Sequence, residues 1–491
     1  MMINRKNLRL INYRAVIRIL GFLLLFEALF MAIPLGVSIF YGERDYYAFA
    51  VGLVTTLLAS FFVLSGVKTA SRDLGRREGY LLTATVWIVF SFFGMIPFMV
   101  SSLSMGVSDA FCETMSGFTT TGCSVLEDIE NLPKGIHVWR CLMQWIGGLG
   151  IMLFTLAVLP MLNSSGGVQM MNAELPGVTK DKLSPRVSQT AKRLWLIYLL
   201  LTISLSLFLC LGPMTVFDGI CHALSTVSTG GFSTRNDSIG AWDSWYIKLV
   251  VLCYMFIGGV NFALIYRASM GKIKSSWKDE TFRLYVVTII VLSILLTIGY
   301  IINCHPEWSA EVIVNPLFQV VSTISSTGYS VTDYQSWGGF VFPILLVLMC
   351  VGGSAGSTSG GCKLDRVIYL FKNCRNEVNR CVHTNRLYSV SINNHVQSPE
   401  IVAKVMAFLW LYVGLILIGG FMLVIMGLPV ADSLFVSLSC VGNTGLGAGV
   451  TAGSFSVIPD AGKWLLSFLM LAGRLEIFTI LVLLTPGFWK K

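Results

Sequence analysis

Charged side chains are scarce in this sequence. Asp, Glu, Lys and Arg make up 12% of the 491 residues, whereas hydrophobic residues make up 55%. Typical soluble proteins are about 25% charged, and a soluble protein with so little charge could not cover its own surface with polar groups. The composition therefore excludes a soluble enzyme, a disordered protein and an ordinary nucleic-acid-binding protein. It indicates an integral membrane protein with many spans.

Clustered metal-ligating or disulfide-forming residues are also lacking. The 12 Cys lie singly, mostly inside apolar stretches and without a C-x-x-C motif, and the 5 His form no cluster. Isolated Cys of this kind are usually small buried hydrophobic residues rather than disulfide partners or zinc ligands. The sequence contains no catalytic constellation, so we expect neither an enzyme nor a bound organic cofactor.

Long apolar runs are what the sequence does contain, and ten of them are long enough to cross a bilayer. The first run is too long for the core of a signal peptide and lacks a persuasive cleavage site, so we expect it to be retained. Only the eighth run is interrupted by a Gly-rich stretch. The runs lie at 16–41, 47–67, 80–103, 137–162, 194–213, 245–268, 284–303, 338–371, 401–427 and 463–487.

The positions of the 35 Lys and Arg residues indicate the orientation in the membrane. With the N-terminus placed in the cytoplasm, 28 of them fall in cytoplasmic segments and 6 in outer segments. Cytoplasmic loops of membrane proteins are enriched in Lys and Arg, so we expect both termini to be cytoplasmic. Arg474 is the only cation that this count places deep in a span, where an unpaired charge costs several kcal/mol.

Four outer connections share one strict pattern. Asp or Asn begins each unit, Ser follows seven residues later, and Gly follows six residues after that. The units read D-A-F-C-E-T-M-S-G-F-T-T-T-G from Asp109, D-G-I-C-H-A-L-S-T-V-S-T-G-G from Asp218, N-P-L-F-Q-V-V-S-T-I-S-S-T-G from Asn315 and D-S-L-F-V-S-L-S-C-V-G-N-T-G from Asp432. A pair of small residues lies in the span after each unit, at Gly147-Gly148, Gly258-Gly259, Gly352-Gly353 and Ala472-Gly473. This register indicates an internal repeat.

The expected fold is an all-α polytopic membrane protein with ten transmembrane helices. Four fused span–pore helix–span repeats surround one pseudo-fourfold pore, and two extra N-terminal helices stand outside the repeat. The expected divisions are 1–70 for the two N-terminal helices, 71–192 for repeat 1, 193–282 for repeat 2, 283–400 for repeat 3 with its broken second helix, and 401–491 for repeat 4.

The first residue of each unit is predicted to cap a short pore helix, because Asp and Asn are preferred N-caps and Pro316 fits the first helical position. These caps are Asp109, Asp218, Asn315 and Asp432. Each helix then ends at a Thr, Ser and Gly segment, and non-helical backbone at membrane depth persists only where it lines a water-filled cavity. One such segment alone is typical of a plain turn, whereas four in register are not.

Four such segments that converge on one axis predict a cation-selective pore. The partially negative C-termini of the pore helices favour a cation, and Gly permits the positive φ that aims carbonyls at the axis. Rings of backbone carbonyls can replace the hydration shell of K⁺. The expected ring residues are Thr120, Thr121, Gly122, Thr229, Gly230, Gly231, Ser326, Thr327, Gly328, Asn443, Thr444 and Gly445.

These features resemble the Trk/Ktr/HKT superfamily of K⁺ transporters, in particular the membrane subunits of bacterial Trk potassium uptake systems. The matching motifs are S-G-F-T-T-T-G (Ser116–Gly122), S-T-G-G-F-S-T (Ser228–Thr234), G-G-S-A-G-S-T-S-G-G (Gly352–Gly361) and G-R-L-E-I-F-T (Gly473–Thr479). The resemblance covers essentially the whole chain and implies four fused units, as in a single-chain tetrameric K⁺ channel. In plant relatives, Ser at the first filter Gly accompanies a preference for Na⁺, so Gly122 implies selectivity for K⁺.

The Gly-rich stretch of the eighth span is the expected gate, because five Gly in ten residues cannot hold a helix. The resemblance implies an intramembrane loop that obstructs permeation and moves during gating. We expect Arg474 to face the cavity, to bond the loop carbonyls and to act as an electrostatic barrier to K⁺. The alternatives are a kink that only eases packing and an ion pair between Arg474 and Glu476. The loop residues are Gly352, Gly353, Ser354, Ala355, Gly356, Ser357, Thr358, Ser359, Gly360 and Gly361.

The resemblance also implies partners and a location. Family members work with a TrkA-like cytosolic nucleotide-binding ring, for which the basic inner segments 163–193, 267–283 and 363–404 are docking candidates, and they form homodimers. We expect the bacterial cytoplasmic (inner) membrane, contact with lipid and no nucleic acid. Passive K⁺ uptake is the expected function. A K⁺ symporter coupled to H⁺ or Na⁺ is the alternative, which repeats of one orientation disfavour.

Overall fold

The computed structural model describes residues 11–67, 75–148, 150, 187–271, 273–383, 386 and 388–489, and the regular structure of this part is helical apart from one short hairpin. Six helical segments in it are long and apolar enough to cross a membrane, and the number is eight if each of two bent helix pairs is one span. The long segments are α1 (Tyr13–Phe40), α2 (Tyr46–Gly66), α3 (Arg76–Gly94) continued by α4 (Ile96–Val100), α9 (Val187–Cys210), α14 (Glu280–Cys304) and α18 (Pro399–Ile425).

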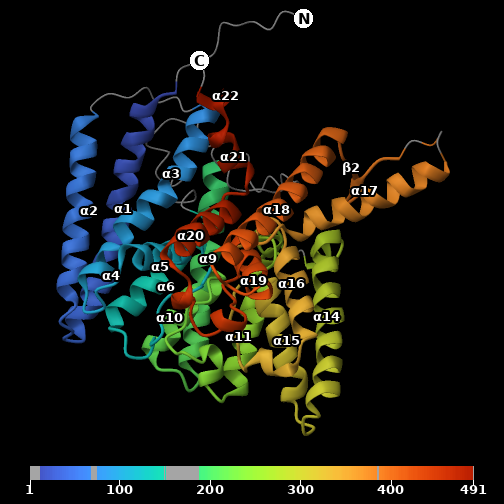
Figure 1. Cartoon of the computed structure of the whole chain (residues 1–491), viewed down its shortest axis with the longest axis horizontal. Helices are drawn as coiled ribbons and strands as arrows, with labels where there is room; N and C mark the ends of the chain where they lie inside the picture. Colours follow the sequence, from blue (N-terminus) through green and yellow to red (C-terminus); the bar gives the residue numbers. More distant parts are fainter. Residues whose placement is uncertain are drawn as a thin grey trace, which may run out of the picture.

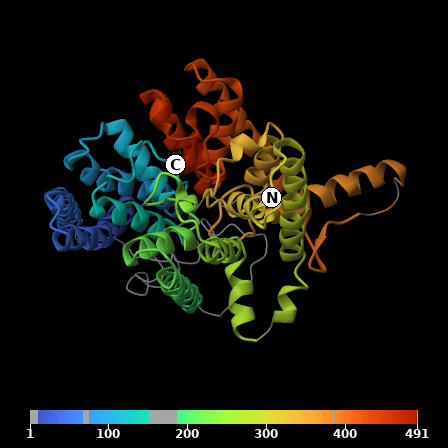
Figure 2. The same ribbon diagram turned by 90° about the horizontal axis from the view of Figure 1, so that it is seen from below.

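One structural unit occurs four times after α2. Each unit has a short apolar helix, and these helices are α5 (Val107–Phe118), α10 (Val216–Val227), α15 (Glu311–Ile324) and α19 (Val430–Val441). A loop and a second helix follow, and the second helices are α6 (Lys134–Gly148), α11 (Trp245–Gly258), α16 (Val341–Val351) and α20 (Asp460–Arg474). The units are arranged around one centre in chain order, with α1 and α2 to one side (Figure 1, Figure 2).

Within the described residues, the second helix is broken in the second, third and fourth units. α11 is followed by α12 (Phe262–Ser269) at an angle of 108°, and α20 is followed by α21 (Phe478–Leu484) at 115°. In the third unit the Gly-rich loop separates α16 from α17 (Leu364–Val382). The Gly-rich break predicted in the eighth span is therefore one of three, and the two bends without a Gly-rich stretch were not predicted. The second half of the predicted span 137–162 lies outside the described residues, apart from Gly150.

The two unpredicted bends are made without runs of glycine. Asn261 caps α12 because its side chain accepts a hydrogen bond from the Ala263 N–H at 2.7 Å. In the fourth unit Glu476 and Ile477 turn the chain with φ values of 55° and 34°. Side-chain capping and strained backbone leave a much weaker mark on the sequence than five glycines do, which is why the bends were missed.

The predicted N-caps are not at the helix ends. α5, α10 and α19 begin two residues before Asp109, Asp218 and Asp432, and α15 begins four residues before Asn315. The capping prediction is therefore wrong for all four. The three Asp lie in the first helical turn, where the helix dipole also favours a negative charge.

The carboxylates of these Asp bind groups beyond their own helices. Asp109 forms an ion pair with Lys463 of α20 at 2.5 Å. Asp218 accepts a hydrogen bond from the Thr234 hydroxyl at 2.6 Å, and Asp432 accepts one from the backbone N–H of Val450 at 3.1 Å. The Asp side chains thus tie the short helices to neighbouring outer segments.

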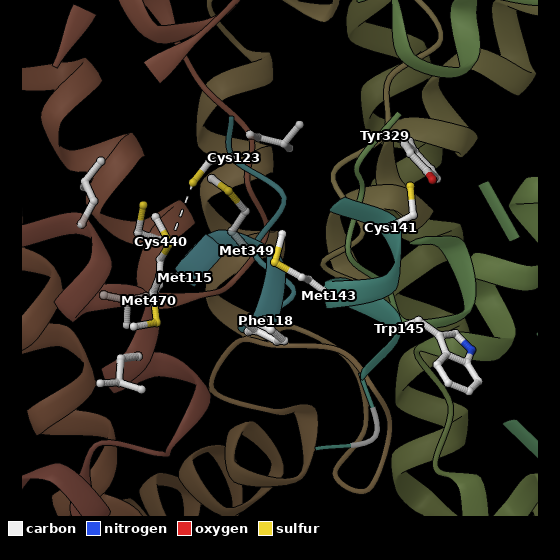
Figure 3. Packing of buried hydrophobic residues seen from close by; sticks show 14 of the residues in the cluster. Met115, Phe118, Cys123, Cys141, Met143, Trp145, Tyr329, Met349, Cys440 and Met470 are labelled. Atoms are coloured by element: carbon white, nitrogen blue, oxygen red, sulfur yellow. Dashed lines mark hydrogen bonds between the residues drawn. The ribbon is translucent and has the colours of Figure 1, made fainter. Parts of the chain in front are cut away.

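The core packs around α5. Figure 3 shows Met115 and Phe118 of this helix among Met143, Cys440 and Met470, which come from three other helices. All of these side chains are at most 1% exposed. The flexible sulfur-containing side chains fill the irregular space between short helices of different tilt.

An arm projects from the bundle. α17 extends away from the bundle in both views (Figure 1, Figure 2), and a hairpin of β1 (Ser391–Ile392) and β2 (His395–Val396) follows it. The first turn of α1 lies at the same end as the last helix, α22 (Figure 1). The remaining elements are α13 (Ile273–Ser276), α22 (Pro486–Trp489) and the 3₁₀ helices η3 (Ser238–Ala241), η4 (Tyr334–Trp337), η5 (Gly449–Thr451) and η6 (Phe455–Val457).

Candidate functional site

The four predicted filter segments adopt one backbone conformation. In each, the first and third of the three residues have positive φ, about 50° and 80° respectively. The pairs are Thr120 and Gly122, Thr229 and Gly231, Ser326 and Gly328, and Asn443 and Gly445. Positive φ on both sides of one residue with negative φ lets the carbonyls of each segment face one axis, as in rings of carbonyls that bind a cation. Positive φ at Thr, Ser and Asn is uncommon, so its occurrence at the same place in all four segments identifies a shared, imposed geometry.

One hydrogen bond holds each segment on its short helix. The backbone N–H of Thr121 donates to the carbonyl of Ser116 at 2.9 Å. The same bond, at the same length, joins Gly230 to Ser225, Thr327 to Ser322 and Thr444 to Ser439. The Ser and Gly register seen in the sequence is therefore the register of this hydrogen bond. It fixes where each helix stops and where the extended segment begins.

The four segments close into a ring. A Cβ built on Gly122 would lie 2.0 Å from the Gly230 carbonyl oxygen, so the first segment touches the second. A Cβ added to Gly231 would lie 1.9 Å from the Thr327 carbonyl oxygen. Likewise, a Cβ on Gly328 would lie 2.2 Å from the Thr444 oxygen, and one on Gly445 would lie 2.2 Å from the Thr121 oxygen. Each segment thus contacts the next, and the fourth returns to the first. No larger residue fits at any of the four glycines without a shift of backbone.

The ring offers oxygen atoms and no charge. The side chains that precede the last Gly of each segment are at most 1% exposed, whereas the four Gly are partly exposed. The groups that remain for a ligand are backbone carbonyls, which can coordinate a dehydrated monovalent cation. The structure therefore brings together all twelve residues predicted for the filter.

The second segment is held by a side chain that the sequence did not reveal. Gln144 of α6 accepts a hydrogen bond from the Ser225 hydroxyl at 2.6 Å and one from the Phe232 N–H at 3.2 Å. Its amide donates to the Gly230 carbonyl at 2.7 Å. In the first and third segments the corresponding Ser instead donates directly to the carbonyl of Cys123 or Tyr329. A polar residue within an apolar span was the only signal for Gln144.

A buried ion pair supports the first segment. Arg140 Nε lies 2.8 Å from Glu113 Oε1, and the side chains are 1% and 0% exposed. The same carboxylate accepts from the Ser124 hydroxyl and, at 3.0 Å, from the Val125 N–H. The Arg140 guanidinium also lies over the ring of Phe232, 4.1 Å from its centre. Arg140 was expected in an outer segment, and the structure places it within α6 as a fully buried side chain.

The Gly-rich loop Gly352–Gly361 lies against the C-terminal ends of α10, α11 and α19. Its backbone N–H groups donate from Ser354 to the Gly259 carbonyl at 3.0 Å and from Gly361 to the Gly442 carbonyl at 2.9 Å. The Thr358 hydroxyl reaches the Val227 carbonyl at 3.4 Å. The loop therefore contacts the second and fourth units, and the N–H of Gly360 adds a bond to Ser326 of the third.

Glycine is required in this loop by close contacts. A Cβ on Gly360 would lie 2.0 Å from the Gly442 carbonyl oxygen, and one on Gly352 would lie 2.4 Å from the Gly360 oxygen. Gly352, Gly356 and Gly361 have positive φ. These constraints explain the glycine content and fit an unwound segment packed directly beneath the ring.

Arg474 binds the loop, as predicted from its place in the repeat. Its Nη1 donates to the Thr358 carbonyl at 3.1 Å. Its Nη2 donates to the carbonyls of Gly147 and Gly148 at 2.6 Å and 3.0 Å. The side chain thus connects the loop to the first unit, whereas the backbone bonds of Ser354, Gly360 and Gly361 reach the other three units. The alternative carboxylate partner, Glu476, forms an ion pair with Arg366 of α17.

The inner segments predicted to dock a partner are only partly described. Residues 163–186 lie outside the described part of the chain. Within 363–404, α17 carries large exposed apolar side chains, which are Phe371, Val378 and Val382 at 65–71% exposure. An exposed apolar stripe on a projecting helix is typical of a surface that another protein or lipid covers.

Known proteins resemble this chain over its whole length. The family model described as TrkH, cation transport protein, matches residues 48–490. The Trk system potassium uptake protein TrkH of Escherichia coli (strain K12) is 36% identical, with 98% of this chain and 100% of that protein covered. The Trk system potassium uptake protein TrkG of the same strain is 33% identical, with 98% and 99% covered.

A solved structure confirms the expected fold class. The crystal structure of the potassium transporter TrkH from Vibrio parahaemolyticus matches with a TM-score of 0.88 and 32% identity, covering 98% of this chain and 100% of that chain. The agreement of sequence and structure over nearly the full length confirms the resemblance inferred from the repeat motifs. The chain belongs to the TrkH family of cation transport proteins.

Proposed function

We propose that this chain takes up K⁺ across the bacterial cytoplasmic membrane through the carbonyl ring of its four filter segments. The single observation that carries the proposal is a closed ring of contacts, in which each filter glycine lies against a carbonyl oxygen of the neighbouring segment. These glycines are Gly122, Gly231, Gly328 and Gly445. The names of the relatives, which are potassium uptake proteins, agree with it. Movement is passive and driven by the membrane potential, at roughly 2.3 kcal/mol per charge per 100 mV.

The proposed repeats have the boundaries expected from sequence, 71–192, 193–282, 283–400 and 401–491, after two N-terminal helices in 1–70. Both termini lie in the cytoplasm. The excess of Lys and Arg in the inner segments supports this orientation. The position of α22 and the start of α1 at the same end of the bundle supports it as well (Figure 1).

The proposed gate is the loop Gly352–Gly361 together with Arg474. Conduction requires the loop to leave its place beneath the ring, because its backbone bonds to Gly259 and Gly442 hold it across the pathway. Arg474 adds a positive charge on that pathway, and its bonds to Thr358 and to Gly147 join the loop to the opposite wall. An open state therefore breaks both sets of bonds.

The proposed partners are a TrkA-like cytosolic nucleotide-binding ring and a second copy of this chain. The word system in the relatives' names supports a multi-subunit assembly. The arm of α17 and the hairpin extend beyond the bundle at the inner end, where a cytosolic ring or a second copy can reach them. The basic segments 267–283 and 363–404 supply charge for that contact.

Reconstitution with ion-flux measurement tests the proposal. The purified chain, with and without its regulatory subunit, is placed in liposomes loaded with K⁺, and release is followed in the absence of Na⁺ and at equal pH on both sides. We expect K⁺ release to be limited only by the diffusion potential that it creates. A carrier that moves a different ion across the membrane removes this potential and should accelerate the release. Strict dependence on Na⁺ or on a proton gradient would instead identify a coupled symporter.

A further inference from the structure

Two cysteines bracket the Gly-rich loop. Cys350 lies two residues before Gly352, near the end of α16, and Cys362 directly follows Gly361. The backbone N–H of Cys362 donates to the Cys350 carbonyl at 3.1 Å, which places the two residues side by side. Both thiols are free. The chain therefore has two thiols that can be oxidised, one at each end of the loop, where the loop meets α16 and α17.

The pair differs in accessibility from the other neighbouring thiols. Cys123 lies beside Cys440 and Cys141 beside Cys221, and all four of these side chains are buried. Cys350 is partly exposed, while its partner Cys362 is buried. A small oxidant can reach a partly exposed thiol, and a buried neighbour then resolves the product.

Positive charge lies next to the pair. Arg366 Nη1 donates to the Cys362 carbonyl at 3.0 Å, and Lys363 donates to the carbonyl of Ser359 in the loop. Cationic groups stabilise the thiolate, which is the form of cysteine that attacks an oxidant or a disulfide.

We propose that Cys350 and Cys362 form a reversible disulfide that locks the loop beneath the filter ring. The oxidant class is a peroxide. The Cys350 thiolate attacks one peroxide oxygen, the S–O bond forms, the O–O bond breaks and hydroxide leaves. The Cys362 thiolate then attacks the sulfenic sulfur, the S–S bond forms and the second oxygen leaves as hydroxide. The two hydroxides take up the two thiol protons, so hydrogen peroxide is reduced to two waters while two thiols are oxidised.

The lock acts by keeping the loop ends together. Opening requires the loop to break its hydrogen bonds to Gly259 and Gly442. These bonds break most easily when the end of α16 moves away from the start of α17. A bond between Cys350 and Cys362 removes every conformation with separated ends, which leaves the compact loop favoured. Oxidation therefore lowers the open fraction, and a dithiol restores it. This inference rests on the proposed gating role of the loop.

The test compares reduced and peroxide-treated full-length chain in liposomes, with K⁺ release as the flux readout. Peroxide is expected to produce the 350–362 disulfide, detected by peptide mass spectrometry, and to lower the flux by about tenfold, within the range that cross-linking a loop of this length allows. Dithiothreitol is expected to restore the flux. Cys350→Ser and Cys362→Ser are expected to keep the flux under peroxide, whereas the exposed-thiol controls Cys253→Ser and Cys381→Ser respond like the unmodified chain.

Two results would overturn the lock: free thiols at both positions after peroxide treatment, or a formed disulfide with unchanged flux. A second readout, hydrogen exchange of the peptide that contains 352–361, is expected to slow in the oxidised chain and not in Cys362→Ser. If the reduced chain conducts no K⁺, the proposed function fails. In that case the exchange measurement alone decides the lock, and unchanged exchange in the disulfide form refutes it.

Discussion

At the residue scale, two kinds of hydrogen bond hold the filter segments in place: bonds within one unit, such as Thr121 to Ser116, and bonds between units, such as Gln144 to Gly230. The filter residues were predictable because Ser116 and Gly122 recur at fixed spacing in four units, and the spacing reflects a local hydrogen bond within each unit. Gln144 was not predictable, because its partners Ser225 and Gly230 lie more than 80 positions away in the sequence. Contacts of that separation leave no periodic trace in a single sequence.

The buried pair of Glu113 and Arg140 is the first residue-scale prediction. Glu113→Gln removes one charge of a pair that is at most 1% exposed, and breaking a buried pair costs about 3–5 kcal/mol because the other charge stays desolvated. We expect a clearly lower thermal unfolding midpoint in detergent. Glu377→Gln is the matched control, since its pair with Arg380 is about half exposed. Equal midpoints for the two variants would show that the buried pair does not support the first segment.

Arg474 is the second residue-scale prediction. Arg474→Ala removes the charge and the bonds to the Thr358, Gly147 and Gly148 carbonyls. We expect K⁺ flux to rise about tenfold, which corresponds to a barrier lowered by roughly 1.4 kcal/mol. Arg474→Lys keeps the charge and should remain near the original flux. Unchanged or lower flux in a well-folded Ala variant would contradict the barrier role.

At the element scale, the apolar pattern of the sequence predicts the long helices well and the breaks in helices less well. The Gly-rich loop after α16 was evident from composition, whereas the bends after α11 and α20 were not. Those bends use the Asn261 cap and positive φ at Glu476 and Ile477. The starts of the short helices were also misplaced, because Asp in a first turn and Asp at an N-cap look alike in sequence.

A single loop glycine tests whether the loop obstructs conduction. In Gly360→Ala the new Cβ would meet the Gly442 carbonyl oxygen at 2.0 Å, and two backbones cannot both keep their places. We expect the loop to move away from the ring and the K⁺ flux to rise severalfold. Gly339→Ala, where nothing lies within 4 Å of the added Cβ, is the control. Lower flux in the first variant at normal stability would show that the loop supports the pathway instead of blocking it.

At the scale of the whole molecule, the four-unit arrangement was predictable and the cross-contacts that close it were not. Repeats can be recognised in a sequence by their internal similarity. The pairing of carbonyls with glycines, however, depends on how the four units pack. The ring contacts from Gly122 to Gly230 and from Gly445 to Thr121 join segments more than 100 and 300 residues apart. They emerge only from the folded chain.

Native cysteines at opposite ends of the molecule test the orientation. Cys304 at the end of α14 and Cys381 on α17 are both exposed. With both termini in the cytoplasm, Cys304 faces outward and Cys381 faces the cytoplasm. A membrane-impermeant maleimide added to intact spheroplasts is expected to label Cys304 and to spare Cys381 until the membrane is opened. The reverse labelling would invert the proposed topology, and Cys304→Ser identifies the labelled site.

The central claim is that four equivalent backbone segments select K⁺, and substitution of their glycines measures this most directly. The ratio of K⁺ to Na⁺ flux is measured in liposomes for four variants, which are Gly122→Ser, Gly231→Ser, Gly328→Ser and Gly445→Ser. The control is Gly36→Ser, because a Cβ added at that position meets nothing within 4 Å. The account predicts that each filter variant loses about tenfold or more in that ratio, about 1.4 kcal/mol of discrimination, while Gly36→Ser keeps it. An unchanged ratio in conducting, well-folded filter variants would contradict the carbonyl ring as the selectivity filter.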